Sequence, residues 1–152
     1  METTTNELPN NSWQKIHSRI NRWISEFEFF ALEITFLQRL LLKGYLWEGE
    51  SDEAILELQR KLNNLELRSE LFIRVIKYHR SQVEAVILNP FAQDGEMIKC
   101  DHEDLKTRIT EFSTDFRLTK SAIYHVMEDT VDTDKLRHSF SSSSATNMIE
   151  FE

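Results

Sequence analysis

Two imidazoles and a carboxylate, His17, His79 and Glu111, are placed where they could hold a metal ion or move protons. If the chain reverses direction near residues 49 and 95, the neighbouring helices are antiparallel. His79 then lies opposite His17 on the preceding helix and opposite Glu111 on the following one. Imidazole and carboxylate are common ligands of first-row metals and common general acids and bases. The sequence therefore allows a metal or small-ligand site at this level. The alternative interpretation is that His79 is a polar residue in an apolar seam that fixes the register of the helices.

The motifs that would turn such residues into an enzyme are missing from the sequence. No histidine follows a glutamate by three residues, the spacing that ferritin-like di-iron bundles use. No glycine-rich loop suited to phosphate is present. The single cysteine, Cys100, has Asp101, Glu103 and Asp104 close by, and negative neighbours oppose a reactive thiolate. We therefore expect a protein that is not an enzyme and that uses no cofactor.

The elements that must position these residues are long helices. The chain of 152 residues contains 3 glycines and 2 prolines, too few for the many tight turns of a β protein. Gly44 and Gly49 indicate one break, and Pro90 and Gly95 indicate the next. Short connections force neighbouring helices to run antiparallel, so the sequence predicts an all-α, up-down-up bundle. The three helices are predicted over residues 12–44, 51–89 and 101–130.

Each predicted helix carries one line of mostly apolar residues at alternating spacings of three and four. This period of about 3.5 residues predicts coiled-coil-like packing around a common core. The lines are Trp13, Ile16, Ile20, Trp23, Phe27, Phe30, Ile34, Leu37 and Leu41, then Ile55, Leu58, Leu62, Leu65, Ser69, Phe72, Ile76, His79, Val83 and Val86, and then Leu105, Ile109, Phe112, Phe116, Thr119, Ile123 and Val126.

The first two predicted helices each carry a second apolar line on a different face. These lines are Phe29, Leu32, Phe36 and Leu40 on the first helix and Leu67, Leu71, Val75 and Tyr78 on the second. One interpretation is that they widen the seam and fill the same three-helix core. The other is that they face another chain, because a helix that is apolar on two faces needs two partners. The second interpretation predicts a homodimer with these eight residues at its interface.

Both ends of the chain lack the seam. We predict a disordered tail over residues 1–10, a bundle over residues 11–130 and a flexible, acidic and serine-rich tail over residues 131–152. The single cysteine and the absence of a secretory signal favour the cytoplasm.

The formal charge of −8 bears on the choice of partner. Residues 91–152 hold 7 basic and 13 acidic side chains, and no third of the chain is net positive. We therefore expect neither nucleic acid nor an anionic membrane as a partner. A small basic face formed by Arg74, Lys77 and Arg80 keeps a nucleic-acid contact as a third possibility.

The predicted function follows from the second apolar lines and the missing catalytic motifs. We expect a non-enzymatic helical module for protein interaction or scaffolding that self-associates through its first two helices and has room for another protein. The alternative is a bundle that binds a metal or a small ligand through His17, His79 and Glu111.

Overall fold

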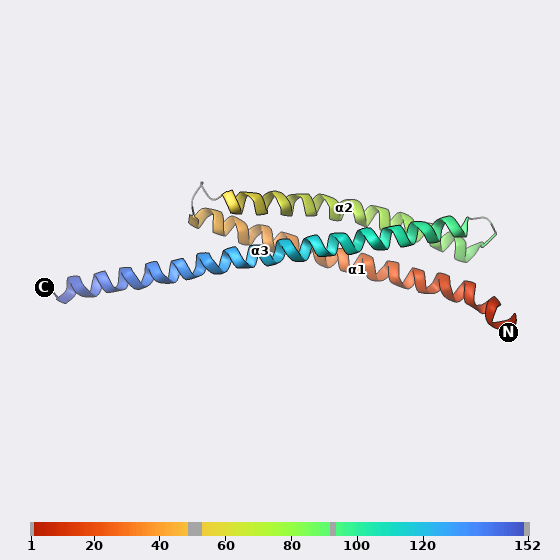
Figure 1. The fold of residues 1–152 in the computed structure, drawn as a ribbon, viewed down its shortest axis with the longest axis horizontal. Helices are drawn as coiled ribbons and strands as arrows, with labels where there is room; N and C mark the ends of the chain where they lie inside the picture. The colour runs from red at the N-terminus through yellow and green to blue at the C-terminus, as the bar shows by residue number, and fades with distance from the viewer. Residues whose placement is uncertain (1, 49–52, 92–93, 151–152) are drawn as a thin grey trace.

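The computed structural model describes residues 2–48, 53–91 and 94–150, with side chains for residues 12–44, 53–91 and 94–129. Within these ranges the chain forms three α-helices and no strand. Helix α1 spans Glu2–Glu48, α2 spans Glu53–Leu88 and α3 spans Gly95–Glu150. Every helix packs against the other two, as Figure 1 shows. The prediction of an all-helical bundle is confirmed.

Polar contacts between helices fix which residues lie at the same level. His17 pairs with Glu84, Arg80 donates to Asn21, and Gln38 donates to Asn63. Along this α1–α2 contact, residue numbers rise on one helix while they fall on the other. Lys120 of α3 pairs with Glu33 of α1 at 2.8 Å, farther along the bundle.

The predicted seam residues form the core. Most are buried, while Ile16, Phe30, Phe72 and Val126 are half-buried and pack against the core. At mid-height three helices contribute a cluster of phenylalanine rings with centroids 4.9–5.6 Å apart. Tilted and edge-on ring pairs at this spacing stabilise the core beyond the burial of their area.

Gly44 does not end α1 as the sequence suggested. It lies buried inside α1, and a β-carbon at this position would overlap the Met127 methyl group of α3. Glycine therefore permits a close approach between α1 and α3, and α1 continues to Glu48.

Helix α3 begins at Gly95 rather than at residue 101. The Asp94 carboxylate accepts a hydrogen bond from the Met97 backbone N–H at 3.2 Å, which is the contact of a helix N-cap. The extra turn carries Ile98, which is 4 % exposed and belongs to the core. Asp94 is thus the start signal, and Asp101 lies inside the helix.

The helices also extend into the segments at both ends of the chain that the sequence analysis assigned to tails. Helix α1 includes residues 2–10 and Pro9 with them, and α3 runs through residues 131–150. No glycine or proline follows Gly95, so nothing local ends α3. Figure 1 shows the last part of α3 projecting beyond the end of α1 and the start of α2.

Candidate functional site

The structure does not bring His17, His79 and Glu111 together. His17 lies between α1 and α2, where its Nε2 is 3.0 Å from Glu84 and its Nδ1 is 3.4 Å from Asn21. Glu111 is exposed on α3. Among the side chains that the structure describes, no three histidine, cysteine or acidic groups are placed to share a metal ion. The predicted metal layer is therefore wrong as a geometric arrangement.

His79 instead pairs with His102 of α3 inside the bundle. The His79 Nε2 and His102 Nδ1 atoms are 2.9 Å apart, and each residue is only 3 % exposed. The two rings stack with centroids 5.1 Å apart, and Trp23 of α1 stacks on His102 at 4.7 Å. One imidazole must donate and the other accept, so both neutral rings satisfy a buried hydrogen bond.

Burial decides the charge of this histidine pair. Desolvation, together with the nearby His79, Arg19 and Lys106, lowers the pKa of His102 to about 4, against the opposing attraction of Glu103. Desolvation also lowers the pKa of His79, against the attraction of Asp101. Both rings are therefore neutral at pH 7, consistent with a structural hydrogen bond across the core.

Sequence reasoning missed His102 because it placed the start of the third helix too late. That error paired α2 and α3 about residue 95 and put Glu111 opposite His79. The line of Leu105 and Ile109 continues upstream at the same spacing through His102 and Ile98. Extending the seam back to Asp94 would have found the pair.

The second apolar lines lie largely on the surface. Seven of the eight residues keep 46–70 % of their surface exposed: Phe29, Leu32, Phe36, Leu67, Leu71, Val75 and Tyr78. Leu40 is half-buried and packs against the core. The interpretation that both lines fill the three-helix core is thus wrong for all but Leu40. We call the exposed residues of α1 (Phe29, Leu32 and Phe36) the α1 line, and those of α2 (Leu67, Leu71, Val75 and Tyr78) the α2 line.

The α1 line borders α3. Residues three and four apart share a helix face, and Phe29 and Phe36 lie four before and three after Glu33. Since Glu33 pairs with Lys120, these two rings lie on the side of α1 that is nearest α3.

The α2 line borders α3 from the other side. Leu71 lies three residues after Arg68, which pairs with Asp115 of α3 at 2.9 Å. Val75 and Tyr78 line an open cavity together with Asp101 and other residues of α3. The two lines therefore flank α3 on opposite sides and do not merge into one surface.

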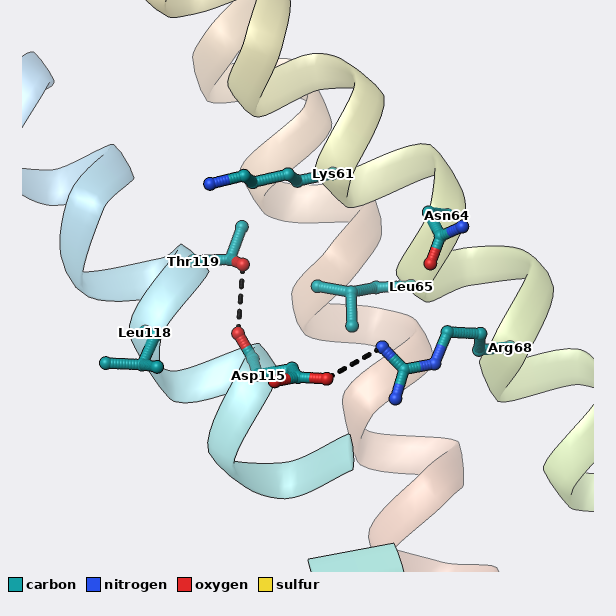
Figure 2. A pocket seen from close by; sticks show the side chains of 7 residues that line it. All are labelled: Lys61, Asn64, Leu65, Arg68, Asp115, Leu118 and Thr119. Atoms are coloured by element: carbon teal, nitrogen blue, oxygen red, sulfur yellow. Dashed lines mark hydrogen bonds and ion pairs between the residues drawn. The ribbon is translucent and has the colours of Figure 1, made fainter. Parts of the chain in front are cut away.

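A shallow cavity of about 270 Å³ extends the flank between α2 and α3. Figure 2 shows Arg68 reaching across to Asp115, with Lys61 extending from α2 above Thr119. The Arg68 guanidinium also lies 5.3 Å from the centre of the Phe112 ring. The ion pair and the ring contact hold the Arg68 side chain in place. The cavity is therefore explained by the packing of α2 against α3, and it does not by itself indicate a ligand site.

The remaining candidates from the sequence lie on the surface. Arg74 and Lys77 are exposed, while Arg80 is partly held by Asn21 and by Glu84. Cys100 is a free, exposed thiol. Over the part of the chain that the structure describes, no helix is long and apolar enough to cross a membrane.

Comparisons with protein-family models, with curated protein sequences and with solved structures give no match to this chain.

Proposed function

We propose that this protein is a non-enzymatic helical interaction module, an antiparallel bundle with coiled-coil-like packing that self-associates through α1 and α2. The observation that carries the proposal is the exposure of seven large apolar side chains in two ordered lines, between 46 % and 70 % each. Scattered single apolar residues on a surface are ordinary, but aligned ones are typical of interaction sites. An exposed free thiol such as Cys100 is consistent with a reducing compartment such as the cytoplasm.

The two possible pairings of the lines offer similar burial energies. Full burial of a large apolar side chain is worth roughly 1.5–3 kcal/mol, so burying the remaining half gives about 1–2 kcal/mol each. Two copies of the α1 line would contribute about 6–12 kcal/mol, and the α1 line packed on the α2 line would contribute about 7–14 kcal/mol. Association costs about 4–15 kcal/mol, so either contact is large enough to offset much of that cost. We propose the pairing that uses both lines, in which the α1 line of one copy packs on the α2 line of another.

Light scattering coupled to size exclusion tests the proposal directly. The α1 variant carries Phe29→Gln and Phe36→Gln, and the α2 variant carries Leu71→Gln and Tyr78→Gln. Each exchange removes an exposed apolar side chain and keeps a good helix former. Each variant alone is expected to be a monomer at concentrations where the unmodified chain is a dimer or larger.

Mixing the two variants distinguishes the ways in which the lines could pair. The α1 variant keeps an intact α2 line, and the α2 variant keeps an intact α1 line. If α1 packs on α2 of the next copy, the mixture forms a heterodimer although neither variant self-associates. If α1 packs on α1, the α2 variant dimerises by itself, which contradicts the proposed pairing.

Matched control variants separate the two lines from general surface hydrophobicity. Leu42→Gln removes an apolar side chain that is 53 % exposed on α1 but outside the α1 line. Phe91→Gln removes a fully exposed ring in the α2–α3 connection. Both controls should assemble like the unmodified chain. A monomeric unmodified chain at micromolar concentration, or equal losses in the controls, would refute self-association through these lines.

A further inference from the structure

A basic groove runs between α1 and α3, beside the buried histidine pair. Two adjoining open cavities of about 450 and 270 Å³ form it, and Arg19 lines both. Six basic side chains line this groove: Lys15, Arg19, Arg22, Lys99, Lys106 and Arg117. The acidic residues of the lining are Glu26 and Glu103, so the lining carries a net charge of about +4 on a chain of net charge −8.

The cations of the basic groove have no carboxylate partners in the part of the structure that is described. Other basic residues, including Arg68, Arg108 and Lys120, form ion pairs there, but none of the groove cations does. The Lys99 ammonium instead lies 5.3 Å from the centre of the Trp13 ring, a cation–π contact that restrains it. Among the described residues, the groove is thus a cluster of cations without ion-pair partners, in which six basic side chains outnumber Glu26 and Glu103.

His102 supplies a buried polar group at the wall of the larger cavity. It lines this cavity although it is only 3 % exposed, and its Nδ1 is taken by His79. Its Nε2 has no partner among the residues whose side chains the structure describes. Among the described residues, the only fully enclosed side-chain nitrogen or oxygen without a hydrogen-bond partner is the Ser69 hydroxyl oxygen. The His102 Nε2 also lacks a partner, so it is not fully enclosed and remains accessible from the cavity.

The direction of the histidine hydrogen bond sets what His102 offers to a ligand. When His79 donates from Nε2 to the Nδ1 of His102, the neutral His102 ring carries its proton on Nε2. That N–H can donate to an anion in the cavity at no cost in protonation. A buried neutral donor beside exposed cations is suited to an oxyanion, because cations neutralise its charge and the donor orients it.

We propose that the larger cavity binds a small phosphate-bearing ligand, held by Lys15, Arg19 and Lys99 and oriented by a hydrogen bond from the His102 Nε2. A volume of about 450 Å³ lies in the usual range for small-molecule sites. The smaller cavity, with Arg22 and Lys106, offers charge for a second phosphate group.

A small ligand fits this surface better than a nucleic acid does. The α1 cations lie between Lys15 and Arg22, a rise of about 10 Å along the helix. Net negative charge elsewhere on the chain repels an extended polyanion.

Titration of the full chain followed by NMR tests the proposal, with inorganic phosphate and tripolyphosphate as probes at matched ionic strength. Saturable shifts are expected at the amides around Lys15, Arg19 and Lys99, and tripolyphosphate should bind at least about tenfold more tightly than phosphate. Nitrogen-15 spectra of the imidazole rings should show a neutral His102 ring protonated at Nε2, and the Nε2 signal should shift as the probe binds while the ring stays neutral. The exposed His125 should show no such change.

Matched variants separate the site from ionic screening. Arg19→Gln should weaken tripolyphosphate binding at least about tenfold. Arg39→Gln removes the same charge from an exposed position of α1 outside the basic groove, and it should leave binding unchanged. Equal losses in both variants, or no saturable shift with either probe, would overturn the proposal. Tighter binding of single-stranded oligonucleotides that grows with their length would assign the groove to nucleic acid and overturn it as well.

Discussion

Acidification should destabilise the bundle through the buried His79–His102 pair. In the folded chain the pKa of His102 is lowered to about 4, because burial disfavours the charged ring. In the unfolded chain its pKa returns to the ordinary value of 6.5. Between these two values the unfolded chain binds more protons than the folded one, so stability is fully present above pH 6.5 and falls as the pH drops towards 4.

The size of this effect follows from the same difference in pKa. Each pKa unit corresponds to about 1.4 kcal/mol, so His102 alone accounts for about 3 kcal/mol over the whole interval. Between pH 6.5 and pH 5 the expected loss is about 2 kcal/mol. His79 adds to it in the same direction, because burial lowers its pKa as well. A small domain is stable by only about 5–15 kcal/mol, so the loss is easily measured.

Urea unfolding followed by circular dichroism, at fixed protein concentration between pH 7.5 and 5, measures this slope. The double variant His79→Leu/His102→Phe removes both titrating rings and leaves no unpaired partner, so its stability should be nearly flat over this interval. The exposed His125→Gln variant should keep the slope of the unmodified chain. If the double variant and the unmodified chain lose stability in parallel, the histidine pair does not control the response to acid.

Three further substitutions test the fold, each by its effect on the free energy of unfolding. Phe112→Ala removes a fully buried ring and should cost about 3–5 kcal/mol, whereas Phe29→Ala, at a site that is 60 % exposed, should cost under about 1 kcal/mol when the chain is monomeric; similar costs would contradict the packing. Asp94→Ala should cost about 1 kcal/mol by removing the cap of α3, and a larger loss from Asp101→Ala would place the helix start at residue 101 instead. Gly44→Ala should change stability by less than about 1 kcal/mol, because the Met127 methyl group must move aside and offsets part of the gain in helix propensity, whereas in a Met127→Ala background the same exchange should stabilise by about 1 kcal/mol; equal effects in both backgrounds would contradict the close contact.

Most of the core could be predicted from the sequence because the spacing of apolar residues along one helix is a local property of that helix. The seam residues from Trp13 to Leu41 are buried or half-buried as their spacing predicted. The same logic identified surplus apolar residues on α1 and α2. The spacing of apolar residues could not show where these additional apolar residues lie relative to the third helix, since their position depends on how α3 packs. The structure alone places the α1 line and the α2 line on opposite sides of α3.

The candidate site was harder to predict, because the register between neighbouring helices depends on where each helix begins. A start at residue 101 instead of Gly95 moves every residue of α3 relative to α2. That shift was enough to pair His79 with Glu111 and to hide His102. A glycine can mark either a turn or a close approach, and the sequence offered no means of assigning Gly44 to the second role.

Net charge likewise conceals the basic groove. The net charge of −8 argued against nucleic acid and an anionic membrane as partners, but a net charge sums over all faces of the molecule and does not describe any one of them. Helix periodicity places Lys15, Arg19 and Arg22 on one flank of α1, where Glu26 is the acidic residue of α1 that lines the groove with them. Packing then sets Lys99 and Lys106 of α3 opposite them. The electrostatic potential that a ligand meets is summed over this groove and not over the chain, so the acidic composition does not argue against the phosphate ligand that we propose.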